Sequence, residues 1–138
     1  MQDLVYILAA LNTFYRSAHW RSKGAFFYQD HLLFARLYEN LDDEIDDLVE
    51  LLIGFTGDDS FVSPQLFNEK TRKFIPIGRS NARANLENAG LIEAELLERI
   101  AKIKESEASV GVYNQLATIA DNHTRNLYLI RQTIKTDA

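Results

Sequence analysis

Apolar residues recur at steps of three and four positions along four long stretches of the chain, and this periodicity constrains the fold more than any other feature. The stretches cover residues 3–23, 29–53, 81–107 and 109–134, and each is long enough for about five or more helical turns. Such spacing places the apolar side chains on one face of an α-helix. The sequence therefore predicts an all-α protein built on four long amphipathic helices.

Glycine and proline residues separate these stretches. Gly24 follows the first stretch, and Gly54 and Gly57 follow the second, at positions where glycine commonly ends a helix. The connection from 55 to 80 is too long for a simple hairpin between helices, and Ser63 followed by Pro64 is typical of a helix N-terminus. We expect a four-helix bundle with one long crossover, which carries a short helix between the second and third long helices.

The composition fits this interpretation and excludes several others. With 138 residues the chain suits one domain over residues 1–138, and its 46% hydrophobic content is enough for a buried core. The absence of cysteine excludes disulfides, thiolate metal sites and a cysteine nucleophile. No stretch reaches about 18 consecutive apolar residues, the length that a membrane span needs, and no secretory leader pattern is present. We expect a cytoplasmic protein without a membrane segment.

The charge of the chain argues against nucleic acid as a partner. Fifteen basic and 20 acidic residues give a formal charge of −5. Binding to a phosphate backbone needs a basic patch or tail, and the sequence shows no such tail. DNA binding is therefore not expected.

Histidine and carboxylate residues are spaced in a way that suggests a metal site. His19 lies at the end of the first predicted helix and His31 near the start of the second. Asp46 and Glu50 are four residues apart on the second predicted helix, so they share one face of it. Imidazoles together with carboxylates suit Fe, Mn or Zn better than Ca²⁺ or Cu(I).

His31 and Asp46 are too far apart to bind one ion within a single chain. The 15 residues between them correspond to about 22 Å along a helix. A second copy of this helix, packed antiparallel across a two-fold axis near residue 39, would bring His31 of one copy to residues 46–50 of the other. The spacing therefore suggests two identical metal sites shared across a homodimer interface.

Each candidate residue also has a simpler interpretation. Asp42, Asp43 and Asp47 are typical of the solvated face of an amphipathic helix. The two site histidines, taken singly, are ordinary polar residues at helix ends. His123, on the last predicted helix, is expected to have a structural or surface role. Trp20, the only tryptophan, is expected to anchor the core or an interface.

An ordered pattern of histidine, aromatic, glycine and carboxylate residues covers the first half of the chain. The second histidine follows the first by 12 residues, the aspartate follows after a further 15, and the glutamate after four more. In this pattern, and in the short helix expected in the crossover, the chain resembles the Dps family of mini-ferritins. The residues that carry the resemblance are His19-Trp20, Lys23-Gly24, Phe26-Phe27, His31-Leu32-Leu33-Phe34, Asp46 and Glu50.

The resemblance implies a ferritin-like fold, a hollow homododecamer built from two-fold dimers, and ferroxidase activity. Such a shell oxidises Fe(II) with hydrogen peroxide or dioxygen at sites between subunits and stores ferric mineral inside, which protects against oxidative damage. His19 and His31 of one subunit would hold the iron together with Asp46 and Glu50 of its two-fold partner, and Zn or Mn could substitute for iron. Trp20 would lie beside the site and donate an electron.

Three features depart from the family pattern. Ala35 stands where the family usually has an acidic ligand, so a water molecule, Glu39 or Asp43 would have to complete the site. The stretch 109–114, where the family often carries an acidic pore, contains no acid, although two glutamates precede it. The Lys-rich tail of the family's DNA-binding members is missing. The alternative function is a structural or DNA-associated Dps-like shell with a degenerate metal site.

Overall fold

The computed structural model describes residues 1–135 of the chain. All of the secondary structure in these residues is helical and none of it is strand, so the all-α prediction is confirmed. The α-helices are Gln2–Arg21 (α1), Phe27–Tyr38 (α2), Leu41–Thr56 (α3), Pro64–Arg72 (α4), Ala82–Ala101 (α5) and Val110–Ile134 (α6), and two short 3-10 helices are Ser60–Val62 (η1) and Glu105–Glu107 (η2).

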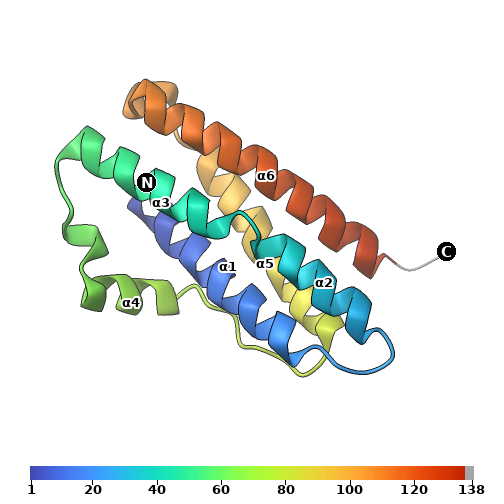
Figure 1. Cartoon of the computed structure of the whole chain (residues 1–138). Helices are drawn as coiled ribbons and strands as arrows, with labels where there is room; N and C mark the ends of the chain where they lie inside the picture. Colours follow the sequence, from blue (N-terminus) through green and yellow to red (C-terminus); the bar gives the residue numbers. More distant parts are fainter. Residues whose placement is uncertain (136–138) are drawn as a thin grey trace.

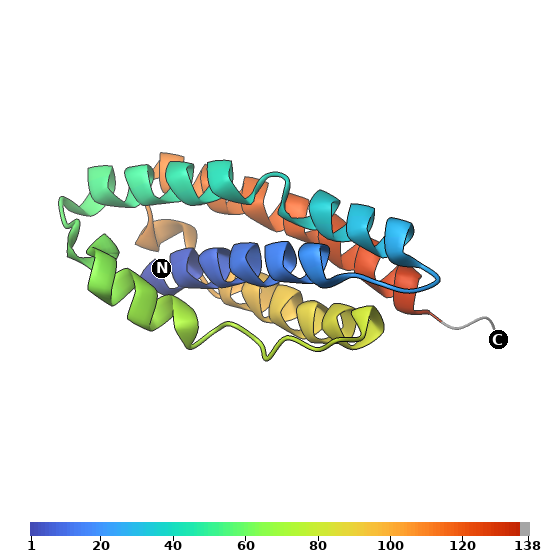
Figure 2. The same ribbon diagram turned by 60° about the horizontal axis from the view of Figure 1, so that its bottom comes forward.

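The long helices lie side by side around a common interior (Figures 1 and 2). α2 and α3 follow each other along nearly one line, and both pack against α1. α1 also packs against α5, and α6 packs against α3 and α5. The segment after α3, which includes α4, contacts α1 and runs to the far end of the molecule, where α5 begins (Figure 2). Residues from all the long helices therefore meet in the middle of the molecule.

Apolar side chains from every long helix fill this interior. α1 is the most deeply buried helix, because every residue from Leu4 to Leu11 is buried and several of its sides face other helices. Burial of apolar surface stabilises such packing by about 25 cal/mol per Å². The largest fully buried side chains are Tyr15, Phe34, Ile7, Leu8, Leu11, Leu37, Leu41, Leu48, Leu86, Leu96, Leu116 and Ile119.

Several helix ends lie where the sequence predicts them. The side chain of Asn81 accepts hydrogen bonds from the first backbone N–H groups of α5, and Ser109 does the same for α6. α4 begins at Pro64, directly after Ser63, as expected for a proline in the first helical position. Gly57 ends α3 with a φ of 74°, a left-handed conformation that glycine adopts without steric cost.

The second predicted helix, 29–53, is wrong as a single element. The structure divides it into α2 and α3, with Glu39 and Asn40 between them. The backbone of Asn40 has φ −101° and ψ 0°, a large departure from the φ of about −63° and ψ of about −42° of a regular α-helix. Asparagine is also a weak helix former, because its amide competes for backbone hydrogen bonds. Buried Leu37 and Leu41 keep the four-residue spacing across the break, so the apolar pattern does not reveal it.

The third predicted helix, 81–107, is too long at its C-terminal end. α5 ends at Ala101, and a separate 3-10 turn follows. In that turn the backbone N–H of Lys104 donates to the side chain of Glu107, whose own N–H donates to the Lys104 carbonyl oxygen. These local bonds replace the helical ones and end the helix early. Among the described residues, no helix combines the length and apolar character needed to cross a membrane.

Candidate functional site

The turn between α1 and α2 brings two of the predicted site residues together. His19 lies near the end of α1 and His31 in the first turns of α2. Gly24, in the turn between them, has a φ of 93°, which a residue with a side chain rarely adopts. The two imidazole rings stack with their centroids 3.7 Å apart and their planes 16° from parallel. The fold thus places the two imidazoles directly side by side.

Reciprocal hydrogen bonds hold the two rings. Nδ1 of His19 lies 2.6 Å from the carbonyl oxygen of His31, and Nδ1 of His31 lies 2.9 Å from the carbonyl oxygen of His19. A carbonyl oxygen can only accept, so each Nδ1 carries the proton and donates it. In a neutral ring Nε2 then keeps its lone pair, and this is how histidine ligands of metal ions are usually held.

Aromatic side chains pack around this histidine pair. The ring of Phe27 stacks on His31 at 5.0 Å, and Tyr38 meets His19 edge to face at 5.6 Å. The guanidinium of Arg16 lies 4.5 Å from the centroid of the Tyr38 ring. Trp20 differs from these neighbours because it is 72% exposed. The two imidazoles are therefore half-buried against aromatic rings, while the tryptophan next to His19 in sequence faces solvent.

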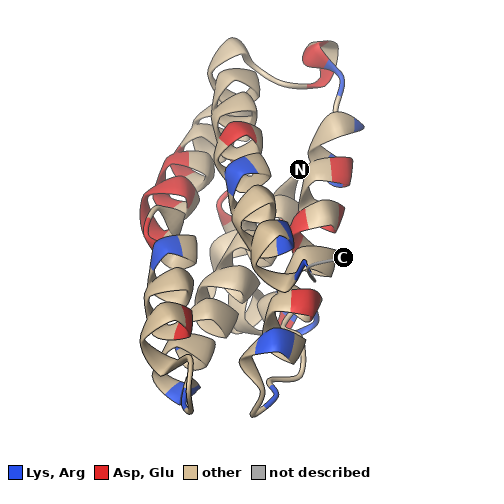
Figure 3. Ribbon diagram, turned by 90° about the vertical axis from the view of Figure 1, so that its right-hand side faces the viewer, with Lys and Arg blue, Asp and Glu red and all other residues tan. Residues whose placement is uncertain are grey.

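The predicted carboxylates are on α3 and not beside the histidines. Asp46 and Glu50 are exposed and one turn apart, within a run of acidic residues that Figure 3 shows along one side of the molecule. Ala35 is half-buried on α2, and Glu39 pairs with Arg36 at 3.5 Å. Within the described residues of one chain, no group of three or more His, Cys, Asp or Glu side chains is arranged so that it could hold a metal ion.

A second cluster of titratable residues, which sequence reasoning missed, lies in the core. The imidazole of His123 donates from Nδ1 to Glu93 at 2.6 Å and from Nε2 to Glu44 at 2.8 Å. The hydroxyl of Tyr15 donates to the other oxygen of Glu93 at 2.5 Å. His123 and Glu93 are 0% exposed and Glu44 is 5% exposed. The four side chains come from α6, α5, α3 and α1, so this core network ties four helices together.

The core network contains a protonated histidine. Burial alone disfavours the imidazolium of His123, but the charges of Glu93 and Glu44 and their hydrogen bonds outweigh it and raise the pKa of His123 to about 10. Burial, together with the charge of Glu93, raises the pKa of the Tyr15 hydroxyl well above its usual value of 10. Both nitrogens of His123 are therefore donors, and the ring bridges two carboxylates as a cation.

The helical pattern of the sequence does not decide whether Glu93 and His123, two members of this network, face the core. On the third predicted helix either Ile92 or Glu93 continues the apolar face, and on the fourth either Asn122 or His123 does. The structure buries Glu93 and His123 completely. The structural role expected for His123 agrees with this burial, while a surface position does not.

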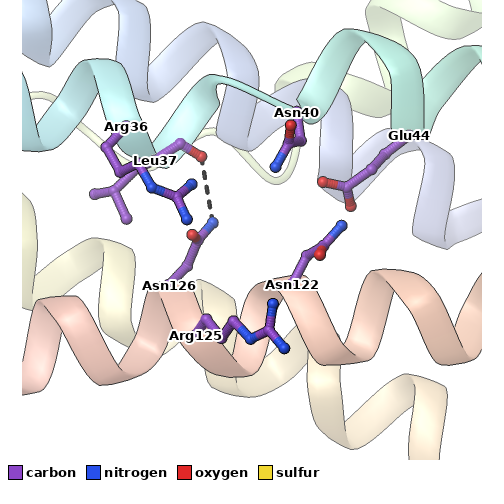
Figure 4. Close-up of a pocket in the computed structure, with 7 residues that line it drawn as sticks. All are labelled: Arg36, Leu37, Asn40, Glu44, Asn122, Arg125 and Asn126. Atoms are coloured by element: carbon purple, nitrogen blue, oxygen red, sulfur yellow. Dashed lines mark hydrogen bonds between the residues drawn. The ribbon is translucent and has the colours of Figure 1, made fainter.

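A polar cavity lies at the break between α2 and α3, next to the core network. It measures about 80 Å³ and faces the middle of α6 (Figure 4). Among its lining residues, Asn126 donates a hydrogen bond to the carbonyl oxygen of Leu37 across the two helices. The full lining consists of Arg36, Leu37, Asn40, Glu44, Asn122, Arg125 and Asn126.

Comparisons with known protein families, curated proteins and solved structures found no match to this chain.

Proposed function

We propose that the chain is a Dps-like mini-ferritin, a ferroxidase that stores ferric mineral inside a shell of identical subunits. The proposed fold is a ferritin-like four-helix bundle in which α2 and α3 together form the second helix and the segment with α4 forms the crossover. The sequence resemblance and the all-α architecture support this proposal. Fe(II) is the substrate of the proposed reaction.

The observation that carries the proposal is the geometry of His19 and His31. Both Nδ1 atoms are engaged with backbone carbonyl oxygens, so both rings offer Nε2 to a cation and are held in fixed orientation. Imidazole nitrogen is a suitable ligand for iron, zinc or manganese.

The carboxylates of Asp46 and Glu50 would come from a second subunit. They are exposed on α3, which carries six acidic residues and no basic residue. Two copies related by a two-fold axis would each give a histidine pair to one site and a carboxylate pair to the other. Exposure of the carboxylates in the single chain is what such a shared site requires.

The proposed reaction transfers one electron from each of two ferrous ions to hydrogen peroxide. Two Fe(II), one H₂O₂ and two H₂O give two FeOOH and four protons, which balances atoms and charge. The carboxylates stabilise the higher charge of the ferric product more strongly than that of the ferrous substrate. Trp20 is next to His19 in sequence and is the proposed donor of one electron to a hydroxyl radical formed from peroxide, which with a proton becomes water, so that radical release is limited.

The test is Fe(II) oxidation by metal-free protein, followed by absorbance with peroxide and with air. We expect faster oxidation than in buffer and a soluble ferric product, on particles near twelve times the 15.8 kDa chain. His19→Ala with His31→Ala should reduce the rate to that of buffer. Asp47→Asn, an exposed carboxylate of the same α3 outside the proposed ligand set, is the matched control and should leave the rate unchanged.

A shell-sized particle that oxidises iron no faster than buffer would overturn the ferroxidase proposal. Ala35, which cannot bind a cation, specifically favours the alternative of a structural or DNA-associated shell. Retardation of duplex DNA by that particle in a gel would then support the DNA-associated form, and the absence of retardation would support the structural one.

A further inference from the structure

The lining of the cavity between α2, α3 and α6 is rich in hydrogen-bond donors. It contains two guanidinium groups, three asparagine amides and one carboxylate. Arg36 pairs with Glu39 at 3.5 Å and Arg125 with Asp121 at 3.3 Å, and each guanidinium has five N–H groups to share. With Glu39 and Asp121 counted, the charged groups at the cavity sum to −1, so its preference for an anion rests on these N–H donors and not on net charge.

Glu44 restricts which anion can bind. Its side chain is nine-tenths or more buried and its carboxylate points into the cavity beside Asn122 (Figure 4). Oε2 of Glu44 already accepts from His123, and a carboxylate donates no hydrogen bond. An anion that reaches Glu44 must therefore bring a hydrogen of its own, because two acceptors facing each other would repel.

The size of the cavity restricts the ligand further. A water-sized atom needs about 10–15 Å³ of such space, so about 80 Å³ holds roughly five to eight such atoms. A tetrahedral oxyanion has one central atom and four oxygens. The cavity has no room for a large organic group attached to one of these oxygens.

We propose that this cavity binds inorganic phosphate in a form that keeps a hydrogen. The P–OH group donates to Glu44, and the remaining oxygens accept from Arg36, Arg125 and the asparagine amides. The proposal is independent of the proposed ferroxidase activity, since it involves neither the histidine pair nor the exposed carboxylates of α3.

The test is calorimetric titration of the metal-free protein with phosphate and with sulfate at pH 7.5 and equal ionic strength. Sulfate has the same shape but no hydrogen at this pH, so we expect one phosphate per chain and at least tenfold weaker binding of sulfate. Glu44→Gln replaces the acceptor with an amide that can donate to either anion, so it should remove this preference. Equal binding of the two anions by the wild-type protein, or no binding of either, would overturn the proposal.

Two further variants separate the cavity from the stability of the core. Arg36→Gln with Arg125→Gln changes only exposed side chains and should weaken phosphate binding at least tenfold, while Arg131→Gln, also exposed on α6, should not. Glu93 belongs to the core network but does not line the cavity, so the Glu93→Gln variant should keep the preference for phosphate. Unchanged binding in the double arginine variant, or the same loss of preference in Glu93→Gln as in Glu44→Gln, would count against the site.

Discussion

The core network shows how single residues can make a helical core specific. Removing charged groups from water costs several kcal/mol per group, and only close partners offset this cost. Here the imidazolium of His123 lies between Glu44 and Glu93, and Tyr15 satisfies a further oxygen of Glu93. Every member depends on the others, so the loss of one leaves a buried group without its partner.

Replacement of His123 by leucine should therefore destabilise the protein strongly. Glu44 and Glu93 would lose their shared cation inside the core, and we expect the free energy of unfolding to fall by about 3–5 kcal/mol. Urea denaturation measures this loss. Glu98→Gln, which removes an exposed carboxylate from the same helix as Glu93, should change stability by less than about 0.5 kcal/mol. Equal effects of the two substitutions would show that the network contributes little.

The raised pKa of His123 predicts how the free energy of unfolding depends on pH. The pKa of His123 is raised from 6.5 to about 10 on folding, so the folded state holds a proton that the unfolded state releases between these values. Its stabilising contribution is complete below pH 6.5 and is lost as pH rises through 10, by on the order of 1 kcal/mol per pH unit. Urea midpoints measured between pH 6.5 and 9 should fall steadily.

A variant without the titrating ring identifies the source of this trend. His123→Asn keeps a polar side chain but cannot bind the proton, so its midpoints should change much less over the same pH range. A wild-type stability that is constant or rises from pH 6.5 to 9 would contradict the assignment of the proton to His123.

At the scale of the helices, the ends contribute measurable stability. Asn81 satisfies backbone donors at the start of α5, which otherwise have no partner inside the helix. Asn81→Ala should lower the free energy of unfolding by about 1 kcal/mol. Asn114→Ala is the matched control, because Asn114 is exposed inside α6 and alanine is the better helix former there. Thermal denaturation of both variants should separate them, and equal melting temperatures would rule out a capping role.

The break between α2 and α3 is the element that relates the fold to both proposed sites. It ends α2 after Tyr38, which packs on His19, and starts α3 before the acidic run with Asp46 and Glu50. It also opens the space that becomes the polar cavity, which an unbroken helix packed on α6 would fill. Glu39 and Asn40 therefore separate the helix with His31 from the helix with Asp46 and Glu50, and the polar cavity lies at this break.

At the scale of the whole molecule, the proposed iron site can be complete only in an oligomer. Chains with His19→Ala and His31→Ala keep their carboxylates, and chains with Asp46→Ala and Glu50→Ala keep their histidines. In a mixed two-fold dimer one of the two sites is intact. Random mixing makes half of the dimers mixed, so co-expressed variants should recover about a quarter of the wild-type ferroxidase rate.

Each variant expressed alone provides the baseline for this complementation. Both should oxidise iron at the rate of buffer while eluting at the size of the wild-type particle. Mixed particles of that size without activity above either parent would show that the histidines and carboxylates do not form a shared site.

The sequence by itself determined the helical class and most helix ends. Steps of three and four between apolar residues specify which face of each helix is buried, and this is a local property of the chain. Helices begin at or next to the predicted positions 64, 81 and 109, because Pro64 fits the first helical position and the side chains of Asn81 and Ser109 accept from neighbouring backbone N–H groups. Gly57 ends α3, whereas Gly54 lies inside it. The shared position of His19 and His31 was implied by the resemblance and not by a local pattern.

Only the tertiary structure decided the core network, the cavity and the division of the second helix. Glu44, Glu93 and His123 are on three helices, and their burial depends on partners 30 to 79 positions away, which no local pattern specifies. The sequence does not distinguish a carboxylate that becomes buried from one on the surface, because the cation that makes burial possible comes from another helix. The break at Glu39 and Asn40 was hidden because the apolar spacing continues across it. Long-range packing, not local preference, determined these features.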